Sequence, residues 1–271
     1  MGNQGEASSS DTLIRMTVLD SIILGVVEGL TEFLPISSTG HLILVGELLN
    51  LPATEFLKSF MIAVQLGAIL AVVLLYWKKF LDIEVLKRLA VGFIPTGIIG
   101  FTLYQLIKEY LIGNTGIVLI SLFVGGIALI AFELFHKESK DGHEEIRSLP
   151  YPTVALVGLF QSVAMIPGVS RSAATIVGGL LLGMRRTTIV EFSFLLAVPT
   201  MLAATGYDLL KSADAFPADG YGLLLIGFIT SLLVALLSMR LLIAFVKKHT
   251  FIPFGIYRIV LAVLFFLFVF I

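Results

Sequence analysis

Long apolar stretches separated by short polar ones run through almost the whole chain. Each stretch extends over 17 to 23 residues, long enough for an α-helix to cross a hydrocarbon layer of about 30 Å. In lipid, only helices and closed barrels satisfy all of their backbone polar groups. The pattern therefore predicts an all-α polytopic membrane protein. Six transmembrane helices are expected, at about residues 56–76, 91–107, 117–135, 190–210, 221–243 and 254–271.

Two further apolar segments are interrupted in the middle. Residues 20–49 are broken by the sequence PISSTG, and residues 155–183 by PGVSRS. Their halves are short: a helix over residues 20–34 would measure roughly 22 Å at about 1.5 Å per residue, too little to span alone. Each segment can therefore be a re-entrant helix-loop-helix hairpin or a single crossing that is kinked at its proline.

The two interrupted segments also resemble each other. A shift of 133 positions aligns Glu28 with Gln161 and Ser38 with Arg171. Internal similarity of this kind is typical of membrane proteins built from a duplicated unit. The expected parts are a single membrane domain at 16–271, with repeat one at about 20–135, a charged cytoplasmic linker at 136–150 and repeat two at about 151–271.

The distribution of Lys and Arg distinguishes hairpins from crossings, because these residues are enriched on the cytoplasmic side of membrane proteins. If both interrupted segments return to the side they entered, twelve Lys and Arg lie on one side and four on the other. Two full crossings would split the same residues nine to seven. Two re-entrant hairpins are therefore expected. Three crossings per half then make the repeats inverted, with both termini outside and the hairpin tips meeting near the middle of the membrane.

Composition narrows the class of protein further. Apolar residues make up 58% of the 271 residues and charged residues 14%, whereas soluble domains have about 45–50% and about 25%. The absence of cysteine excludes disulfides and thiolate chemistry. A net charge of −1 gives no reason to expect nucleic acid as a partner. Residues 1–15 form a polar tail that we expect to be disordered, and no signal peptide is recognisable.

The first interrupted segment carries much of the candidate chemistry. Glu28 and Glu32 are four residues apart, so a helix places them on one face. In so apolar a chain, the two carboxylates must share a proton, pair with an arginine or hold a divalent cation such as Mg²⁺ or Ca²⁺. After Pro35 comes a cluster of small polar residues, typical of a helix break whose freed amides can bind an anion. This cluster consists of Ser37, Ser38, Thr39 and His41.

The second interrupted segment contributes Arg171. An arginine in an apolar segment is costly and requires an anionic partner, and its planar guanidinium matches a phosphate or a carboxylate. If the hairpin tips meet, Arg171 lies near Glu28, Glu32, Ser38 and His41. That set suits phosphoryl transfer, because it offers a nucleophile, an acid or base, a charge clamp and metal ligands. The remaining binding candidates at the two tips are Ser37, Thr39, Ser170, Ser172 and Thr175.

Each of these residues also has a purely structural interpretation. The two glutamates could pair with Arg171 simply as a contact between helices. Serine and threonine beside a helix break commonly cap a helix or pack against its neighbour. A single histidine could be an interfacial, hydrogen-bonded side chain. The joint occurrence of all these groups on two matching hairpins favours a functional site.

At these residues the sequence resembles the bacterial undecaprenyl-diphosphatase family, also called bacitracin resistance proteins. EGLTEFLPISSTGHL is similar to the family's first motif and PGVSRSAAT to its second, and EFSFLLAVP and IPFGIYR also match. The resemblance runs from about residue 20 to the C-terminus. It implies six spans with two re-entrant hairpins in inverted repeats, and a divalent cation for the activity. The family's motif residues fall on Glu28, Glu32, Ser38, His41 and Arg171.

The activity that the resemblance implies is removal of the terminal phosphate from undecaprenyl diphosphate, which regenerates the lipid carrier of peptidoglycan synthesis. Location in the bacterial inner membrane, an outward-facing site and bilayer lipids as partners are implied as well, and a homodimer is left open. We expect Arg171 to bind the diphosphate and Glu28 and Glu32 to hold the cation. Ser38 then attacks the phosphorus or positions a water, while His41 moves the proton.

A transporter is the competing interpretation. Inverted repeats with broken helices are the architecture of secondary transporters, and a flippase for prenyl phosphate lipids would need the same arginine without hydrolysis. A structural scaffold is the third interpretation, and it leaves Arg171 unexplained. Release of inorganic phosphate from a prenyl diphosphate distinguishes the first interpretation from the other two.

Overall fold

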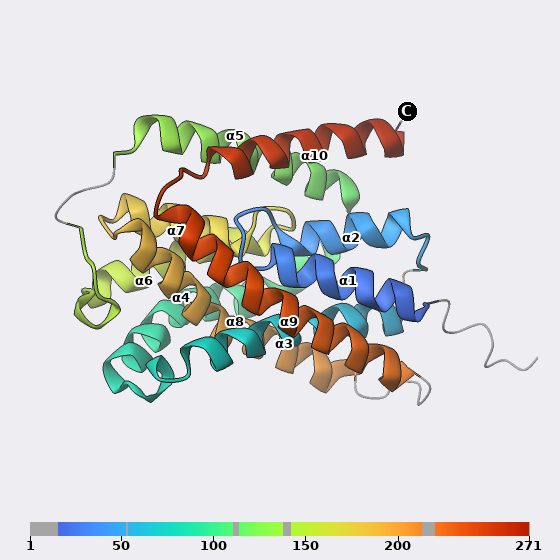
Figure 1. The fold of residues 1–271 in the computed structure, drawn as a ribbon, viewed down its shortest axis with the longest axis horizontal. Coiled ribbons are helices and arrows are strands. Elements are labelled where there is room, and N and C mark those ends of the chain that lie inside the picture. The colour runs from blue at the N-terminus through green and yellow to red at the C-terminus, as the bar shows by residue number, and fades with distance from the viewer. Residues whose placement is uncertain (1–15, 53, 111–113, 138–141, 213–219, 271) are drawn as a thin grey trace, which may run out of the picture.

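The computed structural model describes residues 16–52, 54–110, 114–137, 142–212 and 220–270, apart from the side chains of 55, 104–110, 207–212 and 269–270. These residues form helices and connecting loops, with one isolated β-bridge between His143 and Met184 (Figure 1). The predicted tail, residues 1–15, lies outside the described residues. The α-helices are α1 (Val18–Thr31), α2 (Ser38–Leu48), α3 (Glu55–Tyr76), α4 (Ile83–Tyr110), α5 (Thr115–Phe135), α6 (Tyr151–Ser162), α7 (Arg171–Leu181), α8 (Arg186–Ser212), α9 (Tyr221–Val246) and α10 (Ile252–Phe270).

The predicted all-α class is confirmed, and the chain is a polytopic membrane protein. Among the described residues, five helices are long and apolar enough to cross a membrane, namely α3, α4, α5, α8 and α9. Helix α4 begins at Ile83, earlier than the predicted residue 91, because Glu84 pairs with Lys87 and Arg88 within its first turns. The sixth predicted span corresponds to α10, whose apolar stretch, Ile252–Phe268, is shorter than the other five. A crossing by α10 remains a prediction.

Both interrupted segments form helix-loop-helix hairpins whose arms pack against each other, α1 on α2 and α6 on α7. The breaks share unusual backbone geometry at positions 133 residues apart. Ser37 and Ser170, directly before α2 and α7, have φ of 71° and 81°. Asn50 and Gly183, shortly after the same helices, have φ of 53° and 79°. Left-handed conformations are uncommon outside glycine, so two coincidences at one spacing are what a duplicated unit would produce.

The helices before the linker interlock with those after it. Helix α1 packs on α9, α6 on α4, α3 on α8, and α5 on α10. Glycines permit the close approach: a Cβ at Gly25 would lie 2.7 Å from the carbonyl oxygen of Gly227, and one at Gly158 would overlap the carbonyl oxygen of Gly92. Packing of small residues is the usual means of helix association in lipid, where no hydrophobic driving force acts between helices.

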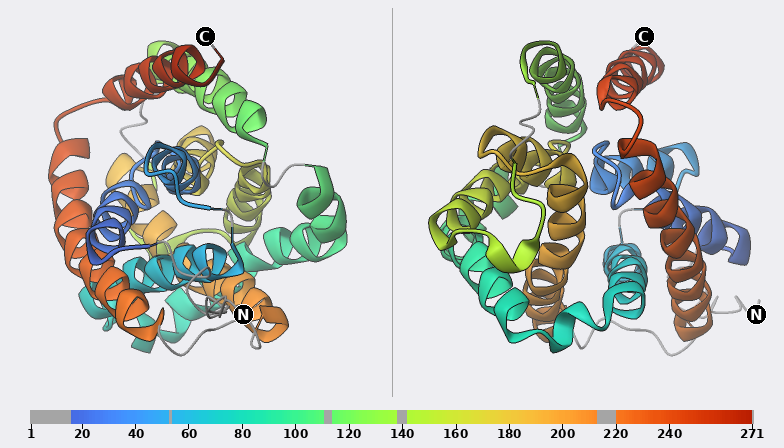
Figure 2. Two further views of the ribbon diagram at one scale, coloured as in Figure 1. Left: turned by 90° about the vertical axis from the view of Figure 1, so that its right-hand side faces the viewer. Right: turned by 60° about the vertical axis from the view of Figure 1, so that its left-hand side comes forward.

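The second arms of the hairpins lie in the middle of this arrangement. Figure 2 shows α2 and α7 surrounded by the longer helices, with α5 and α10 side by side along one edge. The hairpins are held by an apolar core in which Phe33, in the first loop, packs edge-on against Phe194 of α8 at a ring distance of 5.1 Å. Large apolar side chains such as Phe101 and Phe135 are exposed on the outer face, as expected for contact with lipid. Polar side chains gather inside, around the hairpin tips.

Candidate active site

The two hairpin loops present their following helices in the same way. Ser37 and Ser170 are N-cap residues, whose hydroxyls accept hydrogen bonds from the backbone amides of Gly40 (3.4 Å) and Ala173 (3.2 Å). An N-cap hydroxyl satisfies an amide that would otherwise lack a partner in the first helical turn. The residue after each cap is therefore the first of its helix. These residues are Ser38 in α2 and Arg171 in α7.

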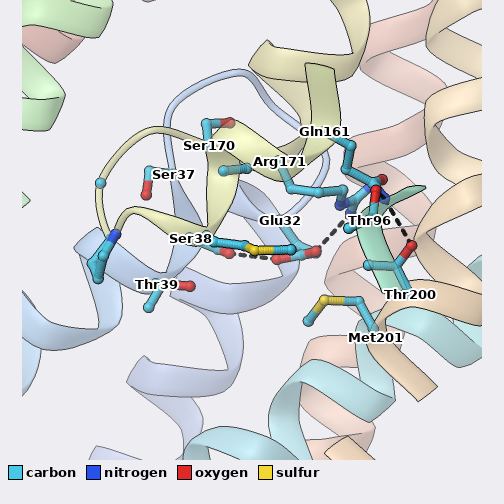
Figure 3. Close-up of a pocket in the computed structure, with 14 residues that line it drawn as sticks. Glu32, Ser37, Ser38, Thr39, Thr96, Gln161, Ser170, Arg171, Thr200 and Met201 are labelled. Atoms are coloured by element: carbon cyan, nitrogen blue, oxygen red, sulfur yellow. Dashed lines mark hydrogen bonds and ion pairs between the residues drawn. The ribbon is translucent and has the colours of Figure 1, made fainter. Parts of the chain in front are cut away.

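Ser38, Glu32 and Arg171 form a hydrogen-bonded chain (Figure 3). The Ser38 hydroxyl donates to Oε2 of Glu32, and Nη2 of Arg171 donates to Oε1 of the same carboxylate at 2.6 Å. The other terminal nitrogen of Arg171 donates to the carbonyl of Ser193 in α8 at 2.8 Å. All three side chains are buried or nearly so. The predicted meeting of Arg171, Glu32 and Ser38 is therefore observed, with Glu32 placed to take the proton of Ser38.

These three residues line a cavity of about 160 Å³ between the two hairpins and helices α4 and α8. One wall carries hydroxyl groups and the guanidinium, while apolar side chains such as Met165 and Met201 close the other side. Nε of Arg171 is buried without a hydrogen-bond partner among the described residues, so the guanidinium retains a donor. Of the predicted residues, those that line the cavity are Glu32, Ser37, Ser38, Thr39, Ser170 and Arg171.

Glu28 lies one helical turn before Glu32 and does not line the cavity. Its side chain is fully buried, and among the described residues neither carboxylate oxygen has a hydrogen-bond partner. The carboxylate is near enough to Glu32 and Arg171 to interact electrostatically with both. Ser231, on the neighbouring helix α9, is also buried with an unpaired hydroxyl. A buried carboxylate without a partner is costly unless it shares a proton or binds a cation.

The residues fit a divalent cation only in part. No group of three or more His, Cys, Asp or Glu side chains suited to a metal occurs among the described residues. Mg²⁺, however, is commonly held by one or two carboxylates together with substrate phosphate oxygens. The unpaired oxygens of Glu28, next to Glu32, match that type of site.

His41 does not reach the cavity. The carbonyl of Ser37 can only accept a hydrogen bond, so Nδ1 of His41 carries a proton and donates to it at 2.7 Å. Nε2 pairs with the Tyr257 hydroxyl at 2.8 Å, and the two rings are stacked at 5.5 Å. Neither nitrogen contacts Ser38. These contacts give no support to the predicted proton transfer by His41, and they indicate instead that His41 supports the loop at Ser37.

Ser172 and Thr175 also lie outside the cavity lining. The Ser172 hydroxyl donates to the carbonyl of Leu34 at 2.8 Å and so connects the second hairpin to the first loop. Thr175 bonds the Ser193 hydroxyl at 2.6 Å, next to the carbonyl that holds Arg171. Both residues therefore position the site and do not line it.

Comparison with known proteins follows from these residues. The family described as "Bacitracin resistance protein BacA" matches residues 21–264, which include both hairpins and every cavity residue. The chain belongs to this family. Proteins named undecaprenyl-diphosphatase from Sulfurihydrogenibium sp. and Persephonella marina are 54% identical over 252 and 255 residues, covering 93% and 94% of this chain and 99% and 100% of theirs. The relative of that name from Thermus thermophilus is 51% identical over 253 residues, covering 92% and 96%.

In this BacA family member, sequence reasoning did not identify a polar cluster on the cavity wall opposite Ser38. The Gln161 amide nitrogen donates to the hydroxyls of Thr96 and Thr200, each at 3.0 Å. Both threonines follow a proline inside a long helix, Pro95 in α4 and Pro199 in α8. A Pro-Thr pair within an apolar span was the available signal, because a helix-interior proline frees backbone groups that hydroxyls can bind.

Proposed function

We propose that this BacA family member hydrolyses undecaprenyl diphosphate to undecaprenyl phosphate and inorganic phosphate, returning the lipid carrier to peptidoglycan synthesis. The observation that carries the proposal is the buried chain from the Ser38 hydroxyl through the Glu32 carboxylate to Arg171 on one cavity wall. It combines an oriented nucleophile, a base and a guanidinium in a low-dielectric site, where such interactions are strongest. The relatives named undecaprenyl-diphosphatase share this chain's sequence over at least 92% of its length.

In the proposed reaction, Arg171 binds the terminal phosphate and Ser38 attacks its phosphorus while Glu32 accepts the serine proton. The anhydride P–O bond breaks, and undecaprenyl phosphate leaves and takes up that proton from Glu32. A water then attacks the phosphoserine with Glu32 again as the base, and Ser38 recovers its proton as phosphate departs. The hydrogen bond from Ser38 to Glu32 is the contact that both steps require. Thr39, Ser37 and Ser170 line the same cavity and supply further donors.

Glu28 and Glu32 are the residues that would hold a divalent cation, Mg²⁺ or Ca²⁺. When bound, such an ion would neutralise charge on the diphosphate. The unpaired oxygens of Glu28 support this assignment, because they give a buried carboxylate a reason to be retained beside Glu32.

We also propose the membrane arrangement. Six crossings and two re-entrant hairpins form an inverted repeat in the bacterial inner membrane, with both termini and the cavity mouth on the outer side. The asymmetry of Lys and Arg supports this arrangement. The matched backbone geometry at Ser37 and Ser170 supports the repeat.

The function is tested with the purified full-length chain in detergent, given farnesyl or undecaprenyl diphosphate and either Mg²⁺ or Ca²⁺. We expect release of inorganic phosphate, its loss with chelator, and a decrease of at least about 100-fold in Arg171→Ala, because a buried charged donor to the phosphate is removed. Arg147→Ala is the matched control, since Arg147 pairs with Asp82 on the surface. A folded wild-type protein that releases no phosphate with either cation contradicts the proposal and favours a flippase.

The role of Ser38 is tested in the same preparation. Rapid quenching during turnover should yield a phosphorylated peptide that contains Ser38, and Ser38→Ala should yield none. Nearly full turnover by Ser38→Ala would mean that a water attacks directly.

A further inference from the structure

Arg258, in α10, is a buried cation whose role the reaction above does not explain. Its side chain is 1% exposed, and it donates hydrogen bonds only to backbone carbonyls. One comes from the first hairpin loop, at Pro35 (3.3 Å). Two come from the second loop, at Gly168 (3.0 Å) and Val169 (2.9 Å). The last two come from α5, at Ser121 (3.0 Å) and Leu122 (3.3 Å).

No carboxylate is among these hydrogen-bond partners. Taking a guanidinium out of water is costly, and a chain normally offsets the cost with an acidic partner. Here the five carbonyl dipoles take that place, and they belong to three separate segments of the chain. Arg258 is therefore the one described side chain that bonds the two hairpin loops and α5 at the same time.

The bonded carbonyls lie directly before the residues that form the cavity wall. All described peptide bonds are trans, so the amide N–H of Ser170 points opposite to the Val169 carbonyl and away from Arg258. Ser170 is the left-handed cap that precedes Arg171, and it lines the cavity. In the first loop, the bonded carbonyl of Pro35 is two residues before the left-handed cap Ser37. Arg258 thus fixes the backbone on which both caps depend.

The preceding residue of α10 secures the first loop from another direction. The Tyr257 hydroxyl bonds Nε2 of His41, whose Nδ1 bonds the carbonyl of Ser37. Two consecutive residues of α10 therefore hold the first loop at Pro35 and at Ser37. Neither residue lines the cavity.

We propose that Arg258 is a positioning residue for the phosphatase reaction. It holds the two loops in the one relative placement in which Ser38 and Arg171 meet on Glu32. The inference rests on the proposed function. It also assigns a role to the IPFGIYR motif, since α10 begins in this stretch and ends it with the clamping pair Tyr257 and Arg258.

Gly125 offers a way to displace the guanidinium without removing its charge. Gly125 is in α5, and a Cβ built on it would overlap Nη2 of Arg258 and lie 2.8 Å from its Cζ. The guanidinium is held by five hydrogen bonds, so it cannot move aside without losing some of them. Gly206, in α8, is the matched control, because an added Cβ there meets nothing within 4 Å.

The first experiment measures kcat and KM for phosphate release from a prenyl diphosphate by Gly125→Ala, Gly206→Ala, Arg258→Lys and Arg258→Met. We expect kcat to decrease at least about tenfold in Gly125→Ala and to stay within about twofold in Gly206→Ala, with KM changing less than kcat. Lysine retains the charge but offers three donors in place of five. Arg258→Lys should therefore be more active than Arg258→Met and less active than wild type.

The second experiment measures backbone hydrogen exchange by mass spectrometry in the folded variants. Exchange should become faster in both loops together, at residues 32–40 and 166–173, in Gly125→Ala and in Arg258→Lys, and it should be unchanged in Gly206→Ala. Full kcat in a folded Arg258→Lys or Gly125→Ala, or faster exchange in only one loop, overturns the inference. If Arg258→Met does not fold, those two variants decide. A wild-type protein that releases no phosphate contradicts the proposed function instead, while the exchange result still tests the clamp.

Discussion

Glu28 is buried at a cost that the fold alone does not repay. Neither of its oxygens has a hydrogen-bond partner among the described residues, and an unsatisfied buried polar group costs about 1–3 kcal/mol, more when it is charged. The position 133 residues later, Gln161, shows that a neutral amide is accommodated at the matching place of the other hairpin. Retention of a carboxylate at Glu28 is therefore better explained by function than by stability.

Replacing Glu28 by glutamine should separate stability from activity. We expect Glu28→Gln to unfold at the same temperature as wild type or at a higher one, because the uncompensated carboxylate is gone. Phosphate release should decrease at least about 100-fold, because the shared proton or the cation is lost. Glu47→Gln is the control, since Glu47 accepts a hydrogen bond from Thr115 far from the cavity, and both properties should be unchanged. A lower unfolding temperature for Glu28→Gln would indicate a structural role for the carboxylate.

Single residues differed in how well the sequence predicted them. Arg171 was predictable, because a guanidinium in an apolar segment requires an acid, and the two candidate acids were only four residues apart. Gln161 was visible as the counterpart of Glu28, but its partners are 65 and 39 residues away in the chain. His41 was assigned to proton transfer, although Tyr257, 216 residues later, holds it at the loop. Long-range partners of this kind leave no local pattern.

At the level of elements, the hairpin loops depend on a serine in a left-handed conformation. Ser37 and Ser170 combine a capping hydroxyl with a positive φ, a backbone conformation that costs of order 1–3 kcal/mol in a residue other than glycine. The sequence predicted that these segments break, because Pro35 and Pro167 are helix breakers. It did not predict left-handed serines, since glycine and asparagine are the usual residues there.

Substitutions at Ser37 should separate the two contributions. Ser37→Ala loses the cap and keeps the strain, so we expect it to be destabilised by about 1 kcal/mol. Ser37→Gly loses the cap but relieves the strain, and it should be less destabilised than Ser37→Ala. Thermal unfolding in detergent measures the difference, and the same order is expected for Ser170→Ala and Ser170→Gly. A glycine variant less stable than the alanine variant would show that the backbone is not strained.

At the scale of the whole molecule, the fold class and the hairpins followed from hydrophobicity and chain breaks, while the interlocking of the halves did not. The pairing of α1 with α9 and of α6 with α4 depends on glycines such as Gly25 and Gly158 that meet a partner backbone far along the chain. Apolar periodicity cannot identify which helix is the partner, because every helix in this chain has an apolar surface.

The proposed orientation in the membrane can be tested directly, because the chain contains no cysteine. Single cysteines at Pro52 and at Arg147, both exposed, should react differently with a membrane-impermeant maleimide added to intact cells. We expect Pro52→Cys to be labelled from outside and Arg147→Cys to be labelled only after the membrane is permeabilised. Lys248→Cys should behave like Arg147→Cys. Labelling of Pro52→Cys and Arg147→Cys from the same side would exclude the proposed arrangement.

Arg258 and the glycine against which it packs are themselves 133 residues apart. If the two halves descend from one gene that was doubled, the ancestral protein was a symmetric pair of identical half-length chains. Two copies of this arginine would then have faced each other at the symmetry axis, each in the space that the other needs. Evolution of a single central clamp therefore required the halves to diverge, one keeping the large side chain and the other giving it up, and fusion into one polypeptide is what made that divergence heritable.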